Sequence, residues 1–85
     1  MAELSSMMNL GKEMDRKLRS VGIGSAEELM AVGSKEAYRR LKALYPNVCL
    51  VHLYCLEGAI GQTEYNCLSK EVRADMKAFS DGLKG

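Results

Sequence analysis

The stretch VCLVHLYCLEGAI, residues 48–60, is the least polar part of this 85-residue chain and holds only one imidazole and one carboxylate. Its apolar residues recur at helical spacing and also occupy the other faces: Leu50, Leu53, Leu56 and Ile60, then Val51, Tyr54 and Ala59. A helix that is apolar on most faces is typical of one surrounded by the rest of its domain. We predict that residues 48–60 form a central helix, about 20 Å long at about 1.5 Å per residue, and that it is the most buried helix of the fold.

The first predicted helix precedes this stretch and spans residues 11–21. It is indicated by apolar residues on one helical face, namely Leu10, Met14, Leu18 and Val21. The Gly22–Ile23 pair that follows resembles a Schellman motif, in which a glycine just after the last turn ends a helix. We therefore expect the chain to turn at Gly22.

A capping box predicts the second helix. Ser25 and Glu28 have the required spacing, and each side chain is expected to bind a backbone N–H group at the start of the helix. The helix is short, over about residues 26–32, and Gly33 ends it.

The third predicted helix begins at Ser34, which can cap it, and ends before Pro46, because the residue before a proline is disfavoured in a helix. Its expected inner face consists of Ala37, Leu41 and Leu44. Its outer face is mostly basic and carries Arg39, Arg40 and Lys42.

The last predicted helix is capped by Ser69, and its inner residues are expected to be Val72, Met76, Phe79 and Leu83. Residues 1–8 lack a helical period and form either an arm or a short turn that lays Leu4, Met7 or Met8 on the core. Residues 9–85 then form a single domain. We predict an all-α fold of five helices, with a helix-hairpin-helix-like (SAM-like) arrangement around a buried fourth helix.

Composition and charge limit the possible functions. Twelve Lys and Arg residues against eleven Asp and Glu leave a formal net charge of +1, so no global field attracts nucleic acid or an anionic membrane. The amino terminus lacks the features of an export signal, and no segment could span a bilayer. The three cysteines are an odd number and are expected to be reduced. We therefore expect a cytoplasmic protein that has no membrane partner.

The residues Cys49, His52 and Cys55 have the spacing C-x2-H-x2-C and, with Cys67 downstream, resemble zinc ligands. On one helix, however, Cys49 and Cys55 lie about 120° apart, so their thiolates diverge. We interpret both as small hydrophobic residues and expect no metal. A Cys–His nucleophile pair is not expected either, because the apolar run lacks the electropositive, accessible surroundings of a reactive thiolate. We expect no enzyme activity, no cofactor and no small-molecule substrate.

Glu57 is the odd residue of the central stretch, because an unpaired buried carboxylate is too costly for a folded protein. It must either face a gap to solvent or be held by hydrogen bonds. We favour a structural role for Glu57, with Arg39, Arg40 or exposed backbone N–H groups of a neighbouring helix as its partners.

Two glycine turns are the candidate binding features of the chain. Residues 18–29 resemble a helix-hairpin-helix, whose glycines let backbone N–H groups at a helix start approach a phosphate. The carboxylates of Glu27 and Glu28 already stand at this helix start, where the positive field would otherwise attract a phosphate. We therefore interpret this first turn as structural.

The second glycine turn, within residues 32–41, is the better phosphate candidate. Its candidate nucleic-acid-binding residues are Gly33, Ser34, Lys35, Arg39 and Arg40. The alternative is that the basic residues only keep a helix face soluble. So few cations predict weak, salt-sensitive binding to a nucleic-acid backbone with little sequence preference.

Several short elements of the chain together resemble one protein family. They are NLG at 9–11, VGI at 21–23, SAEEL at 25–29, the VG and EAYRRL elements of 32–41, and LYCLEGAI at 53–60. The family they resemble is the carboxy-terminal domain of TfoX/Sxy proteins, which are regulators of bacterial DNA uptake. The similarity covers about residues 9–79, although Tyr65 stands where family members commonly have Trp.

The TfoX resemblance implies a small helical domain with a helix-hairpin-helix-like arrangement, and it implies no enzyme activity. It also implies a stand-alone carboxy-terminal domain, because the chain has no room for an amino-terminal TfoX domain. We therefore expect a non-enzymatic regulatory or interaction module of bacterial type, with weak nucleic-acid contact through the Gly33 turn. The alternative is a protein-binding adaptor without nucleic-acid contact.

Overall fold

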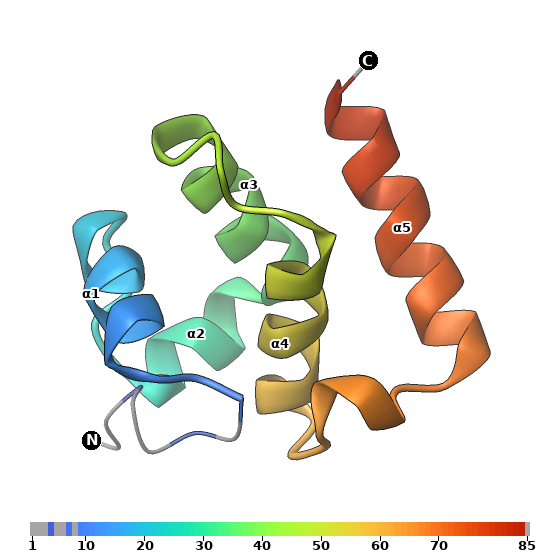
Figure 1. The fold of residues 1–85 in the computed structure, drawn as a ribbon. Helices are drawn as coiled ribbons and strands as arrows, with labels where there is room; N and C mark the ends of the chain where they lie inside the picture. Colours follow the sequence, from blue (N-terminus) through green and yellow to red (C-terminus); the bar gives the residue numbers. More distant parts are fainter. Residues whose placement is uncertain (1–3, 5–6, 8, 85) are drawn as a thin grey trace.

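The computed structural model describes residues 4, 7 and 9–84 and contains five α-helices in that part of the chain (Figure 1). They are α1 (Lys12–Ser20), α2 (Ala26–Val32), α3 (Ser34–Leu44), α4 (Leu50–Ile60) and α5 (Lys70–Lys84), with a 3-10 turn, η2 (Tyr65–Cys67), before α5. None of the described residues lies in a β-strand, so the predicted all-α class with five helices is confirmed. The helix-hairpin-helix-like arrangement stays a prediction.

Helix α4 is the centre of the domain, as predicted. It packs against α3, α5 and η2, and Figure 1 shows it between α1 and α2 on one side and α5 on the other. Leu53 and Leu56 are fully buried, and Val51, with 49% of its surface accessible, is the one exposed residue of the helix. The apolar faces of α4 are therefore covered except at Val51.

The start of α4 differs from the prediction in two ways. The helix begins at Leu50, two residues later than predicted, because Cys49 is extended and forms the N-cap. The Cys49 backbone N–H donates to Nδ1 of His52 at 3.1 Å, and the Cys49 thiol lies 3.4 Å from the same nitrogen. Cys49 is therefore an exposed residue at a helix end and not the small core residue we expected, whereas Cys55 is half-buried.

His52 makes the stability of this helix start dependent on pH. Partial burial, and then the positive charge of Lys17, lower the pKa of His52 below its ordinary value. When the folded pKa is lowered, the neutral ring contributes stability that is complete above about pH 6.5 and is lost as the pH falls through the folded pKa. A proton on Nδ1 would also remove the acceptor of the Cys49 N–H.

We therefore expect the melting temperature to fall between about pH 7.5 and pH 5.5, and we expect His52→Gln to flatten that fall. A Gln at this position does not titrate but can still accept the N–H of the N-cap residue, as in a capping box. Circular dichroism melts of both proteins at the two pH values measure the difference. Equal falls in the two proteins would show that His52 does not control this pH dependence.

The hydrophobic core collects residues from all five helices and from the segments before and between them. Its members are Leu4, Leu10, Met14, Leu18, Ile23, Leu29, Ala37, Tyr38, Leu41, Val48, Leu53, Leu56, Ala59 and Met76. Of the three residues considered for the amino-terminal turn, Leu4 is fully buried and Met7 packs against the core. Met8 lies outside the described residues.

The predicted Schellman ending of α1 is confirmed. Gly22 has a φ of 87°, and the Ile23 N–H donates to the carbonyl of Leu18 at 2.9 Å. The cap of α2 is as predicted at Ser25, whose hydroxyl oxygen accepts the N–H of Glu28 at 3.2 Å. The Glu28 carboxylate, however, faces the Ser25 hydroxyl and not a backbone N–H, so the reciprocal half of the capping box was wrong.

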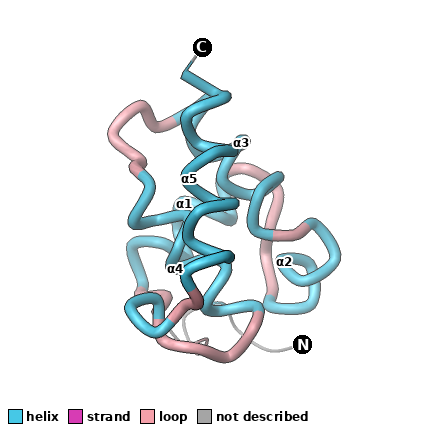
Figure 2. Tube along the Cα trace, turned by 90° about the vertical axis from the view of Figure 1, so that its right-hand side faces the viewer, coloured by secondary structure: helices cyan, strands magenta, loops and turns pink. Residues whose placement is uncertain are grey.

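Helix α5 begins as predicted, because the Ser69 hydroxyl oxygen accepts the N–H of Val72 at 3.2 Å. Two residues predicted to be inner are nonetheless exposed, Leu44 at 54% and Leu83 at 39%. Both lie in the last turn of their helices, α3 and α5. Figures 1 and 2 show the end of α5 extending beyond the other helices. None of the helices in the described part of the chain is long and apolar enough to cross a membrane.

Candidate functional site

The turn at Gly33 borders an open groove. Gly33 has a φ of 91°, a backbone conformation that residues with a side chain rarely adopt. It is both the C-cap of α2 and the N-cap of α3. A groove of about 600 Å³, which we call the Gly33 groove, lies between this turn, the end of α4 and α5. It is lined by residues 32–36 and Arg39, by Glu57 and Ile60 of α4, and by Asp75, Met76 and Phe79 of α5.

Ser34 was predicted to cap α3, but it does not. It is the first residue of the helix, because the glycine before it is the N-cap, and its hydroxyl donates to Oε1 of Glu57 on α4 at 2.6 Å. The partner of Glu57 on α3 is therefore a serine. Arg39 and Arg40, two of the partners that we considered for Glu57, bind Glu36 instead.

Lys35 connects the turn to α5. Its Nζ lies 2.8 Å from Oδ2 of Asp75 and 5.7 Å from the centre of the Phe79 ring, in a cation–π contact. Both charged side chains are well exposed, so the pair contributes little to stability. It does, however, place the lysine charge beside a carboxylate at the edge of the groove.

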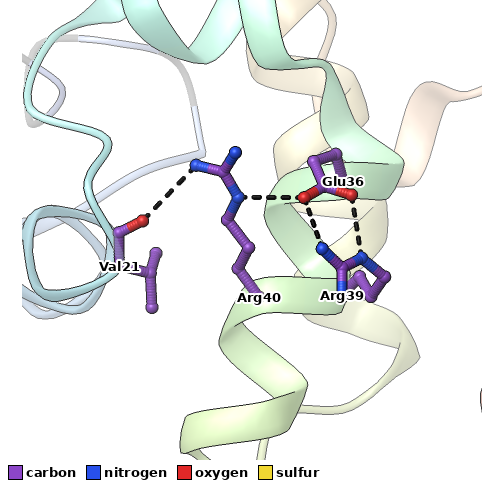
Figure 3. A network of polar contacts seen from close by, with 4 residues as sticks. All are labelled: Val21, Glu36, Arg39 and Arg40. Atoms are coloured by element: carbon purple, nitrogen blue, oxygen red, sulfur yellow. Dashed lines mark hydrogen bonds and ion pairs between the residues drawn. The ribbon is translucent and has the colours of Figure 1, made fainter.

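Glu36 binds both arginines of the turn (Figure 3). Arg39 donates to it from Nε at 2.8 Å and from Nη2 at 2.6 Å, and Arg40 donates from Nε at 3.0 Å. The hydrogen bonds from Arg39, followed by the one from Arg40, lower the pKa of Glu36 to about 2, so this carboxylate is ionised at neutral pH. Arg40 also reaches the carbonyl of Val21 at 3.5 Å and so connects α3 to the end of α1.

The charged side chains that line the Gly33 groove sum to −1, and Arg40, which also binds Glu36, lies outside this lining. Lys35 and Arg39 contribute two positive charges, and Glu36, Glu57 and Asp75 contribute three negative charges. A phosphate entering the groove would meet cations that already bind carboxylates. The groove instead combines fixed charges of both signs with apolar side chains.

The structure brings four of the five predicted site residues to this groove, because Gly33, Ser34, Lys35 and Arg39 all line it while Arg40 does not. Five further groove residues were not predicted as partners of the turn: Glu36, Ile60, Asp75, Met76 and Phe79. Glu36 had a local signal, since it stands three and four residues before the two arginines on one helix face. The residues of α5 had none, because only tertiary packing brings them to the turn.

The cysteines do not form a metal centre with other side chains in the part of the chain that the structure describes. No group of three or more His, Cys, Asp or Glu residues there could hold a metal ion. Partial burial, and then the nearby Cys49, raise the pKa of the Cys55 thiol, which keeps this thiol protonated at neutral pH. Protonated thiols are poor nucleophiles and poor ligands.

Comparisons with known proteins identify a family model, and the similar solved structures include two from Listeria monocytogenes. The model of the TfoX C-terminal domain matches residues 1–80. A triclinic crystal structure of an uncharacterized protein from Listeria monocytogenes is 37% identical, with a TM-score of 0.96, over 99% of this chain and 96% of that chain. A tetragonal crystal structure of a Listeria monocytogenes protein of unknown function is 36% identical, with a TM-score of 0.91, over 94% of this chain and 99% of that chain. No curated protein matches the chain at a significant level.

Proposed function

The chain belongs to the TfoX C-terminal domain family, and from this membership we propose that it is a non-enzymatic regulatory module that binds another protein. The binding surface in this proposal is the Gly33 groove. The observation that carries it is the composition of the groove, in which a net charge of −1 accompanies apolar side chains.

The charge balance of the groove favours a protein over a nucleic acid as the partner. Binding to a phosphate backbone draws its affinity from cations that replace condensed counterions. In the groove, Lys35 and Arg39 are already paired, with Asp75 and Glu36 respectively. A protein–protein interface instead usually combines an apolar core with a polar rim, and the groove holds both kinds of side chain.

We expect no salt-dependent binding of this protein to duplex DNA. Fluorescence anisotropy with a labelled duplex at about 50 and 200 mM salt tests this expectation, with Arg39→Gln/Arg40→Gln as the comparison. Binding with a dissociation constant near 10⁻⁴ to about 10⁻⁶ M that weakens with salt and disappears in the double variant would establish the nucleic-acid alternative instead.

The direct test of the proposed function is a selection of short random peptides, displayed on phage, against the full chain. Bound peptides are then compared on Ile60→Ser and Val51→Ser, which change two apolar residues of α4 of which only Ile60 lines the groove. We expect Val51→Ser to bind like the parent and Ile60→Ser to bind about tenfold more weakly, because truncated apolar anchors cost more than about 1 kcal/mol. Thermal melts verify that both variants are folded. A lack of enriched peptides, or peptides indifferent to Ile60→Ser, would contradict the proposal.

We also propose that the module acts in the cytoplasm. All three cysteines are free, and Cys49 and Cys67 are exposed. Exposed free thiols are typical of proteins in a reducing compartment.

A further inference from the structure

Glu57 differs from the other charged residues of the Gly33 groove because it has no counter-ion among the described residues. Its half-buried carboxylate accepts one hydrogen bond, at Oε1, from the neutral hydroxyl of Ser34. The other four charged side chains of the groove form two ion pairs, Lys35 with Asp75 and Arg39 with Glu36.

This arrangement leaves binding capacity at Glu57. An ionised carboxylate has two oxygens with about four acceptor positions, and Ser34 occupies one of them. Glu57 is only partly buried and lines the groove, so a ligand in the groove can reach its carboxylate. The cations that line the groove, Lys35 and Arg39, are paired with Asp75 and Glu36, and neither of them is bonded to Glu57. A ligand that supplies its own cation therefore gains a charge-assisted hydrogen bond without disrupting the groove.

We propose that the protein partner binds through a segment that places a Lys or Arg side chain on Glu57 and an adjacent apolar side chain on Ile60 and Phe79. This inference rests on the proposed function and specifies the chemistry of the partner. Ile60 and Phe79 are only partly buried, so they offer apolar surface beside the carboxylate. Glu57 is the one groove carboxylate without an ion pair among the described residues, and it therefore complements a cationic segment and disfavours an anionic one.

The test uses the peptides that are enriched against the full chain and compares the variants Glu57→Gln and Asp81→Asn. Gln retains an oxygen that can accept from Ser34, so Glu57→Gln removes the charge while preserving the internal hydrogen bond. Asp81→Asn removes an exposed carboxylate of α5 outside the groove and is the matched control. We expect the peptides to contain Lys or Arg and to bind Glu57→Gln about 10- to 100-fold more weakly, with no change for Asp81→Asn.

A second measurement links the two charges directly. Replacing the Lys or Arg of the peptide by Gln should weaken binding to the parent, and the same replacement should have little further effect on Glu57→Gln. Two results would overturn the inference while leaving the proposed function intact. One is a set of peptides that bind Ile60→Ser more weakly but contain no Lys or Arg. The other is a set of such groove-dependent peptides that bind Glu57→Gln as well as they bind the parent. A lack of groove-dependent peptides would contradict the proposed function itself. Self-association of the free chain in sedimentation experiments that Glu57→Gln abolishes would make a second copy the occupant and would overturn the assigned partner.

Discussion

Replacing Leu53 by Ala is expected to lower the free energy of unfolding by about 2 to 5 kcal/mol. Leu53 is fully buried within α4, the helix that packs against α3, α5 and η2. Truncation loses the transfer free energy of the removed carbon atoms and leaves a cavity that the surrounding helices fill only partly. A whole domain is stable by only about 5 to 15 kcal/mol, so the change would remove a large fraction of the total. Urea melts followed by circular dichroism measure the loss.

The matched control for Leu53→Ala is Val51→Ala on the same helix. Val51 is the exposed residue of α4, with 49% of its surface accessible, so its truncation creates no buried cavity. We expect its effect on the free energy of unfolding to stay within about 0.5 kcal/mol. A loss below about 1 kcal/mol for Leu53→Ala, or equal losses at the two positions, would show that α4 is not the centre on which stability depends.

The central place of α4 could be predicted because it depends on composition alone. A helix that is apolar on nearly every face is removed from water only when other parts of the domain surround it. The end of α1 and the start of α2 could be predicted, because the chain around Gly22 and Ser25 satisfies backbone groups of these same helices. Such local hydrogen bonds need no tertiary contact. The start of α4 was misplaced because nothing local marks Cys49 as an N-cap.

The residues of the candidate site were predictable only where their signal was local. Gly33 and the basic residues after it stand out in the sequence, but their partners do not. Ser34 was expected to cap its own helix, yet its hydroxyl binds Glu57, which is 23 residues away in the chain. Lys35 likewise binds Asp75 on α5. Pairings of this kind decide whether a cation is available to a ligand, and they depend on how the helices pack.

The second large effect on the free energy of unfolding is expected from a substitution at Gly58, which lies on α4 against the segment that precedes α1. A Cβ atom added at Gly58 would overlap the Asn9 side-chain nitrogen and the carbonyl oxygen of Thr63. Neither group can move freely, because Asn9 Nδ2 donates to that carbonyl at 2.8 Å, and Asn9 Oδ1 accepts the N–H of Tyr65 at 3.1 Å. Asn9 itself has a φ of 72°, which asparagine tolerates better than most residues.

Gly58→Ala should therefore lower the free energy of unfolding by about 1 to 3 kcal/mol, the usual cost of adding a carbon atom to a close-packed site. The structure can relieve the overlap only by moving the Thr63 backbone or by releasing the Asn9 side chain. Either response weakens the hydrogen bonds that connect the start of the chain to the link between α4 and η2. Hydrogen exchange of the Tyr65 amide reports on this connection directly, and we expect that amide to lose protection in the variant.

The matched control is Gly82→Ala, the same substitution at a helical glycine of α5 where nothing lies within 4 Å of the added carbon. Alanine has the higher helix propensity, so this variant should be unchanged or more stable, by up to about 1 kcal/mol. A lower free energy of unfolding for Gly58→Ala, together with an unchanged or higher one for Gly82→Ala, would show that the loss comes from the contact with Asn9 and Thr63. The exchange of glycine for alanine would then not explain it. Asn9 and Gly58 belong to NLG and LYCLEGAI, two of the elements by which the chain resembles its family. If Gly58→Ala were as stable as the parent and Tyr65 stayed protected, these two elements would not depend on the close contact that joins them.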